Sequence, residues 1–197
     1  MHQQHMQREN GILIGVVTDL KDPDGLGRVR VRFPYLDDQQ SAWAKICSPM
    51  AGKNRGLFFR PEVDDELLVA FEMGDPRRPY VLGALWSKTD TPPADDGKKE
   101  KNNWRFIRSR SGHVFKFDDT DGAERIELID KDAKLKLVID TASDKVQIVC
   151  NSGSVEIKAS SGKVQIDASS AEIKASGDMT LQAGGQMTIK GNVVNIN

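Results

Sequence analysis

Carboxylates are the first residues in this chain whose spacing could support catalysis. Glu62, Asp64, Asp65 and Glu66 lie within five residues of one another, and paired carboxylates can exchange protons with a substrate. They stand at the start of the apolar run 66–71, a position typical of a solvent-exposed turn. The pattern therefore favours a turn over an active site. The motifs GxSxG, HExxH and the P-loop are absent, so we predict no catalytic residue.

Histidine and cysteine side chains do not form a recognisable metal motif. His2 and His5 have a spacing that could share a metal ion, but they lie in a polar N-terminal segment without further ligands. His113 follows a glycine and is predicted to pack at a junction between strands. Cys47 and Cys150 are far apart, which indicates two buried free thiols rather than a disulfide or a metal site. We therefore predict neither a metal nor a cofactor.

A basic stripe raises the question of nucleic-acid binding. Strict alternation in RVRVR (28–32) places three arginines on one face of a strand, and basic grooves with stacking aromatics bind single strands. The residues involved would be Arg28, Arg30, Arg32, Trp43, Phe58 and Phe59. A formal net charge of -1 and an aromatic content of 6% argue against this function, so we predict no nucleic-acid partner.

The bulk composition excludes several other classes of protein. No apolar run approaches the roughly 18 residues that a membrane span needs. The first ten residues, MHQQHMQREN, are polar and lack the apolar core of a signal peptide, so we expect synthesis in the cytoplasm without a cleaved signal. Residues 88–103 are charged, contain two prolines and lack large apolar side chains, which predicts a linker.

Strand-like runs fill the first part of the chain, and no stretch shows a helical stripe. Turn signals rich in Gly, Pro and Asp separate five short apolar runs. These runs are residues 11–17, 28–33, 42–46, 66–71 and 80–85. Five strands of this length in one short segment predict a small closed barrel of the OB type.

The last third of the chain repeats a strand-sized pattern. Each repeat has two apolar residues separated by one residue, followed by small or polar residues at a corner. The pairs are Val146/Ile148, Val155/Ile157, Val164/Ile166, Ala171/Ile173, Met179/Leu181, Met187/Ile189 and Val194/Ile196, and Leu135, Leu137 and Ile139 open the series. Residues two apart in a strand point the same way, so each repeat presents one narrow apolar face.

One such face cannot enclose a core without neighbours. A three-sided solenoid of a single chain would have little more than two turns here, fewer than the three repeats that solenoids normally need. A disordered low-complexity tail is the other alternative, but disorder does not require apolar pairs in fixed phase. Three identical chains wound around one axis satisfy the pattern, so we predict a homotrimeric β-helical shaft.

Three motifs resemble the OB region of phage baseplate assembly protein V and of the VgrG spike proteins. They are DPxxxGRVRV at 22–31, PEVxDExLVxF at 61–71 and GDPxxPxVLG at 74–83, and residues 107–128 resemble the family's junction between barrel and shaft. The family often has glycine at the position of Asp64, so a slightly altered turn is expected there. Some family spikes end in an iron-binding His-x-His motif, which the C-terminal GNVVNIN lacks.

The resemblance implies an all-β protein in which an N-terminal five-stranded OB barrel precedes an intertwined triple-stranded β-helix formed by three chains. It implies a non-enzymatic central spike of a contractile injection machine, in a phage tail or tail-like particle, which seats the tail tube and pierces the target envelope. The expected partners are two further copies of the chain, a separate hub protein at the barrel end and a PAAR-type tip protein at the C-terminal end. Contact with the target membrane is expected to be transient.

The expected domain boundaries follow from these patterns. They are a flexible tail at 1–10, the barrel at 11–87, a linker at 88–106, junction strands at 107–134 and the trimeric β-helix at 135–197. Two alternatives of other classes stay open on the sequence alone. One is an OB-fold single-stranded nucleic-acid-binding protein with an oligomerising tail. The other is a tail-associated glycan hydrolase, which would need a carboxylate pair in a cleft.

Overall fold

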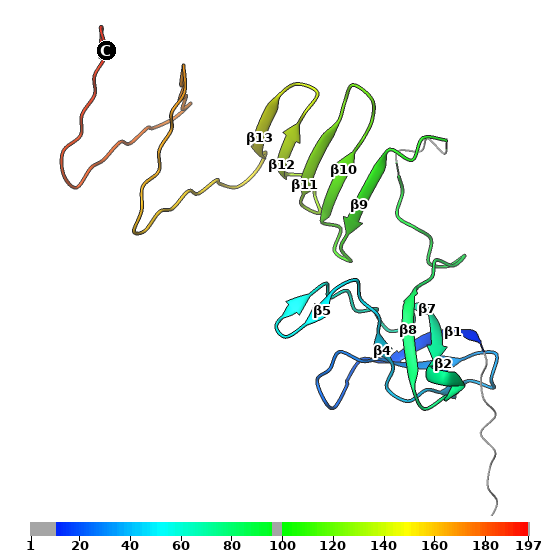
Figure 1. The fold of residues 1–197 in the computed structure, drawn as a ribbon. Helices are drawn as coiled ribbons and strands as arrows, with labels where there is room; N and C mark the ends of the chain where they lie inside the picture. The colour runs from blue at the N-terminus through cyan, green and yellow to red at the C-terminus, as the bar shows by residue number, and fades with distance from the viewer. Residues whose placement is uncertain (1–10, 96–99, 197) are drawn as a thin grey trace, which may run out of the picture. The chain divides into compact units, whose positions relative to one another are not determined.

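The computed structural model describes residues 11–95 and 100–196, and this part of the chain consists of β-strands and loops (Figure 1). The single helical element among these residues is a 3₁₀ turn, η1 (Glu72–Gly74). The prediction of an all-β chain is therefore confirmed for the described residues. The chain divides into two units between Val149 and Cys150. His2 and His5, together with the predicted tail 1–10, lie outside the described residues.

A six-stranded sheet forms the N-terminal part of the fold. Its strands follow the spatial order β3-β2-β1-β7-β8-β4, and a separate hairpin pairs β5 with β6. Their bounds are β1 (Ile12–Asp19), β2 (Arg30–Phe33), β3 (Gln39–Gln40), β4 (Lys45–Ile46), β5 (Ala51–Gly52), β6 (Arg55–Gly56), β7 (Glu66–Phe71) and β8 (Pro79–Ala84). The five predicted runs correspond to β1, β2, β4, β7 and β8, although the run 42–46 keeps only two strand residues.

A bridge between Val29 and Ala44 curls this sheet toward a barrel. The Val29 amide donates a hydrogen bond to the Ala44 carbonyl oxygen at 3.1 Å, and the Ala44 amide donates to Val29 at 2.8 Å. Directly after Ala44, β4 pairs in parallel with β8. The segment before β2 is thereby linked through residues 44–46 to β8, on the other side of the sheet. This curled sheet is consistent with an OB domain.

The core of the barrel comes from alternate positions of its strands. Its most deeply buried side chains, each at most 1% exposed, are Val17, Val29, Val31, Ala44, Leu67, Val69 and Val81. Successive side chains point to opposite faces of a strand, which keeps Arg30 and Arg32 out of this core. Gly15 allows the close packing of β1, because a Cβ there would lie 3.1 Å from Val31 Cγ2.

The turn before β7 contains the position where a glycine would be expected. Asp64 has a φ of 75°, in the left-handed region that favours glycine but that aspartate also visits. Its amide donates a hydrogen bond to the Val17 carbonyl oxygen at 2.9 Å, which ties the turn to β1. Asp64 therefore keeps the conformation that a glycine would adopt, and the turn carries some backbone strain.

A second, five-stranded sheet follows in the order β13-β12-β11-β10-β9. Its strands are β9 (Trp104–Arg108), β10 (Val114–Asp118), β11 (Arg125–Ile129), β12 (Leu135–Asp140) and β13 (Lys145–Cys150). β9 to β12 pair antiparallel as successive hairpins. Strands β12 and β13 coincide with the first apolar repeats that the sequence assigns to the shaft.

Residues 151–196 contain no strand and are exposed along their whole length in the single chain. Bends at 151–153, 160–162, 169, 176–177, 184–185 and 192 interrupt this extended segment. The runs between the bends are 154–159, 163–168, 170–175, 178–183, 186–191 and 193–196. Each run carries one of the predicted apolar pairs. The intertwining of three such chains stays a prediction.

We expect the barrel core to respond sharply to a cavity at Leu67. Leu67→Ala removes a side chain that is 1% exposed and should lower the free energy of unfolding by about 2–5 kcal/mol. Leu82→Ala in the neighbouring strand is the matched control, because Leu82 is 44% exposed, and should cost less than about 1 kcal/mol. Urea unfolding followed by tryptophan fluorescence measures both. Equal losses would contradict this assignment of the core.

Candidate functional site

The five-stranded sheet leaves an apolar face open to solvent. Its registers align two rows of apolar side chains across the strands, Ile107–Phe115–Leu128–Leu137 and Phe117–Ile126–Ile139. Ile107 is 51% exposed and Leu128 is 48% exposed in the single chain. A sheet of a soluble protein normally covers such a face with another layer. This face is therefore a candidate surface for assembly.

The opposite face of the same sheet holds a buried network of charged side chains. Lys116 Nζ lies 2.5 Å from Glu127 Oε2, 3.5 Å from Asp118 Oδ2 and 4.1 Å from the centre of the Trp104 ring. The Arg125 guanidinium lies within 3.9 Å of both carboxylates. Sequence reasoning missed this network because the pairs form across strands, and only the strand register brings them together.

Asp118 stays ionised within this network. Burial raises the pKa of its carboxyl, but hydrogen bonds from the side chain and backbone of Thr120, followed by the charges of Lys116 and Arg125, bring the pKa below its usual range. The network thus joins β9, β10 and β11 on the polar face. It is a structural feature that needs no ligand to neutralise it.

In residues 151–196, the bends define the phase of the apolar residues. In each full run of six, the second and fourth positions are the apolar pair, and the sixth position is small. These small residues are Ala159, Ala168, Ala175, Ala183 and Gly191. Because the second, fourth and sixth positions share one face, each run presents its apolar pair, which contains a small residue only at Ala171, and then a small residue before the corner. We call this face the apolar strip, and its small sixth residues agree with the small corner residues expected from the sequence.

Two ion pairs mark the opposite side of the runs. Lys158 Nζ lies 2.8 Å from Glu156 Oε1, and Lys174 Nζ lies 2.8 Å from Glu172 Oε1. Both pairs join residues two apart, so their side chains project together and away from the apolar strip. The strip itself is open: Ile157, Ile166 and Ile189 are each 65% or more exposed. Residues 154–196 thus have one apolar and one charged side, and the exposed apolar strip is a candidate surface for assembly.

A compact loop at 22–28 is organised around Asp22. Its carboxylate accepts hydrogen bonds from the backbone amides of Asp24, Leu26 and Arg28 and from the Arg28 side chain, whose Nη2 lies 2.6 Å away. The Arg28 side chain and these amides hold the pKa of Asp22 well below its usual range, against the opposing effect of desolvation. The motif residues of this loop therefore have a structural role.

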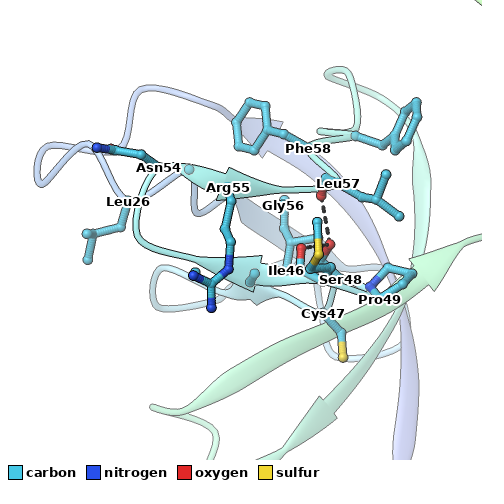
Figure 2. Close-up of a pocket in the computed structure, with 15 residues that line it drawn as sticks. Leu26, Ile46, Cys47, Ser48, Pro49, Asn54, Arg55, Gly56, Leu57 and Phe58 are labelled. Atoms are coloured by element: carbon cyan, nitrogen blue, oxygen red, sulfur yellow. Dashed lines mark hydrogen bonds between the residues drawn. The ribbon is translucent and has the colours of Figure 1, made fainter.

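A groove lies between this loop and the β5–β6 hairpin, and Figure 2 shows it. Its volume is about 590 Å³, and its apolar lining includes Leu26, Ile46, Met50, Leu57, Phe58 and Phe59. Within the groove, Ser48 Oγ lies 3.0 Å from the Met50 carbonyl oxygen and 2.7 Å from the Leu57 carbonyl oxygen. None of the lining side chains carries a carboxylate or an imidazole.

A smaller hollow of about 310 Å³ at residues 72–78 does contain two carboxylates. Hydrogen bonding from Arg77 lowers the pKa of Asp75 to about 2, and a hydrogen bond from Tyr80 lowers the pKa of Glu72. A glycan hydrolase needs one carboxyl group with a raised pKa to act as general acid. This pair therefore lacks the property that the glycan-hydrolase alternative requires.

The carboxylates first considered in the sequence occupy the turn before β7. Asp65 Oδ2 accepts a hydrogen bond from the Glu62 amide at 2.8 Å, and Glu62 and Asp64 are exposed, as expected for a turn. His113 is also exposed, and its Nδ1 accepts a hydrogen bond from the Lys131 amide at 3.2 Å. Within residues 11–95 and 100–196, no three His, Cys, Asp or Glu side chains gather where they could hold a metal ion.

The prediction of buried thiols was wrong, although both cysteines are free. Cys47 is exposed and lines the groove, and Cys150 is half-buried, with its Sγ 3.4 Å from the Ser152 carbonyl oxygen. The reason lies in their positions: Cys47 follows a strand of only two residues at the sheet edge, and Cys150 ends β13. Neither site is covered by a second layer in the single chain.

The three arginines of the basic stripe are engaged locally. Arg28 pairs with Asp22 and Asp24, Arg32 pairs with Asp38 at 2.7 Å, and Arg30 stacks on Trp43 at 4.8 Å. Ion pairing and stacking reduce the positive potential available for phosphates. The nucleic-acid alternative is therefore not favoured. The described residues also contain no helix that meets the length and apolarity of a membrane span.

Comparison with known proteins agrees with this geometry. Residues 13–86 match the family described as the type VI secretion system/phage-baseplate injector OB domain. The matched segment runs from β1 to the end of β8, so it contains the whole curled sheet.

Three curated relatives are VgrG proteins. The chain is 29% identical over 113 residues to the actin cross-linking toxin VgrG1 of Vibrio cholerae, which covers 53% of this chain and 10% of the relative. It is 29% identical, over the same share of this chain and 11% of the relative, to the type VI secretion system spike protein VgrG3 of Vibrio cholerae. It is 27% identical over 134 residues to the spike protein VgrG1a of Pseudomonas aeruginosa, covering 58% of this chain and 21% of the relative. The chain thus spans about a tenth to a fifth of the length of these relatives.

We expect the loop at 22–28 to be stabilised by the ionised form of Asp22. Because the folded pKa of Asp22 lies below its unfolded value of about 3.9, its contribution is complete above about pH 5 and is lost as the pH falls toward the folded pKa. Asp22→Asn should therefore melt below the wild type at pH 7, with a difference that shrinks at acid pH. Asp24→Asn is the control, because the Asp24 side chain is 64% exposed, and should have a smaller effect. A constant difference across pH 7 to pH 3 in thermal melts would contradict this role.

Proposed function

We propose that this VgrG-like baseplate or spike protein acts as the homotrimeric central spike of a contractile injection machine. The observation that carries the proposal is the apolar strip of residues 154–196, which keeps its phase through successive runs and is open in the single chain. A side chain such as Ile157 or Leu181 contributes roughly 1.5–3 kcal/mol when fully buried. The single chain gains little of this, because Ile157 is 72% exposed and Leu181 is 67% exposed, so the strip supports an assembly.

Three copies are the arrangement that best fits the runs. Each extended run supplies one apolar side between two bends, and three such sides, one from each of three copies, would enclose a core around one axis. Three parallel copies would turn the strips of all chains toward one axis, with the small sixth residues at the corners. The exposed charges Glu156, Lys158, Glu172 and Lys174 would then face solvent. The open apolar face of the β9–β13 sheet would be covered in the same assembly.

The role that follows is mechanical. A narrow β-structured shaft without a catalytic pocket can transmit force along its axis, and the OB domain at residues 13–86 would seat the spike under the tail tube. We propose a separate hub protein at the barrel end, a PAAR-type tip protein at the other end, and piercing of the target envelope on sheath contraction. The protein would belong to a phage tail or a phage tail-like particle.

The strip predicts a sharp difference between inward and outward substitutions. Ile166→Asn places a polar amide in the proposed core of all three copies, where an unpaired buried polar group costs about 1–3 kcal/mol each. We expect loss of the trimer, measured as a solution mass three times the chain mass of 21.8 kDa and as a band that resists SDS at room temperature. The neighbouring Gln165→Asn, on the outward side, should leave both unchanged. A monomeric wild type, or equal behaviour of the two variants, would refute the proposed spike.

A further inference from the structure

Charged residues of three successive runs are aligned by the bends of the chain. In the runs 154–159, 163–168 and 170–175, the fifth position is Lys158, Asp167 and Lys174 in turn. The fifth position of an extended run lies on the side opposite the second and fourth positions. The ion pairs of Lys158 with Glu156 and of Lys174 with Glu172 agree with this placement for two of the three residues. We call the three residues the charge ladder.

The threefold arrangement decides which runs become neighbours. If each chain moves to the next of three faces at every bend, a given face is filled in turn by the three copies. Run n of one copy then lies beside run n+1 of another copy, at the strand spacing of about 4.8 Å. Equivalent positions of consecutive runs therefore meet between copies, not within one chain.

We propose that the charge ladder sets the register of the three copies, with Asp167 of one copy between Lys158 and Lys174 of the other two. This inference rests on the proposed trimer and names the residues that recognise the partner, a second and third copy of this chain. Within the described part of a single chain, Asp167 forms no ion pair, whereas Lys158 and Lys174 are each held by a glutamate of their own run.

The charge pattern of the neighbouring positions points the same way. The outward charges are negative then positive in the first run (Glu156, Lys158) and in the third (Glu172, Lys174). In the middle run they are positive then negative, at Lys163 and Asp167. At the fifth position, opposite charges of successive runs therefore lie side by side. Lys163, at the first position of its run, lies diagonally between Glu156 and Glu172, at the third position of theirs. Cross-strand pairs of opposite charge stabilise a sheet, and like charges destabilise it.

The apolar strip distinguishes one register from another only weakly. Val/Ile occurs at 155/157 and at 164/166, and Met is paired with Leu or Ile at 179/181 and 187/189, so among the full runs only the pair Ala171/Ile173 is clearly smaller. A copy that slipped by one run would still bury comparable side chains. It would, however, place Lys158 beside Lys174 and Glu156 beside Glu172. The ladder therefore penalises the slipped assembly, as polar residues do in other repetitive cores.

Reversing one charge in the full-length chain tests the ladder. Asp167→Lys turns two attractions per copy into repulsions, and we expect the melting temperature of the trimer to fall by about 5 °C, with a smaller SDS-resistant fraction. Roughly 0.5 M salt should reduce the difference, because the pairs are exposed. Asp178→Lys is the matched control: it makes the same charge change on the outward side, where the equivalent positions of the adjacent runs are Ser170 and Gln186.

A rescue variant separates the ladder from a general defect. Asp167→Lys combined with Lys163→Glu, Glu156→Lys, Lys158→Glu, Glu172→Lys and Lys174→Glu inverts the outward charges of all three runs, keeps the opposite charges within the first and third runs, and should recover most of the lost melting temperature. Asp167→Asn should lose about half as much as Asp167→Lys. The ladder is refuted if Asp167→Lys matches Asp178→Lys, or if the inverted variant fails to recover. In both cases a trimeric wild type would leave the proposed spike standing, whereas a monomeric wild type would refute the spike itself.

Discussion

The constraint on which the shaft depends is the length of chain between two bends. A run of six residues has room for two large apolar side chains and one small one, all on the same side. No second strand covers them, because residues 151–196 contain no strand in the single chain. The barrel differs, because its strands pair in one sheet and the bridge between Val29 and Ala44 lets one chain enclose Leu67 and Val69. The barrel therefore has a core within one chain, whereas the proposed shaft would obtain its core only from partner copies.

The five-stranded sheet shows how a single chain can hold its shape while one face stays apolar and open. Its stabilising contacts lie on the polar face, where Lys116 is held by Glu127, Asp118 and the Trp104 ring. These contacts tie three strands together without the apolar rows of the other face. In the isolated chain, the contacts that stabilise the sheet thus lie on its polar face, whereas most sheets are stabilised by their apolar face. The apolar face therefore stays available to partners.

Sequence patterns correctly predicted those strands and turns that depend on residues close together in the chain. The run 66–71 became β7 with the predicted bounds, and the turn before it was correctly identified, because alternation and turn residues act over a few positions. The Lys116 network escaped prediction, since it depends on the register between strands. Cys47 was wrongly placed in the core because a short edge strand has the same composition as a buried one. The groove beside Phe58 is lined by Gly27, which has a φ of 72° and where a Cβ would lie 3.0 Å from the Phe58 ring, and only coordinates reveal this close approach.

A shaft made from near-identical runs separates two tasks that one core performs in most proteins. The apolar strip supplies the driving force for burial but tolerates many alignments, because similar volumes recur at every run. Specificity must then come from residues that differ between runs, and in residues 154–175 these are the outward charges. Exposed pairs are individually weak, but in the proposed trimer threefold symmetry would repeat each of them in every copy, so small preferences would add along the shaft. In the proposed shaft, the outward charged side chains would thus determine how the inward apolar side chains are aligned. In the barrel, by contrast, the buried apolar side chains determine how the strands pack.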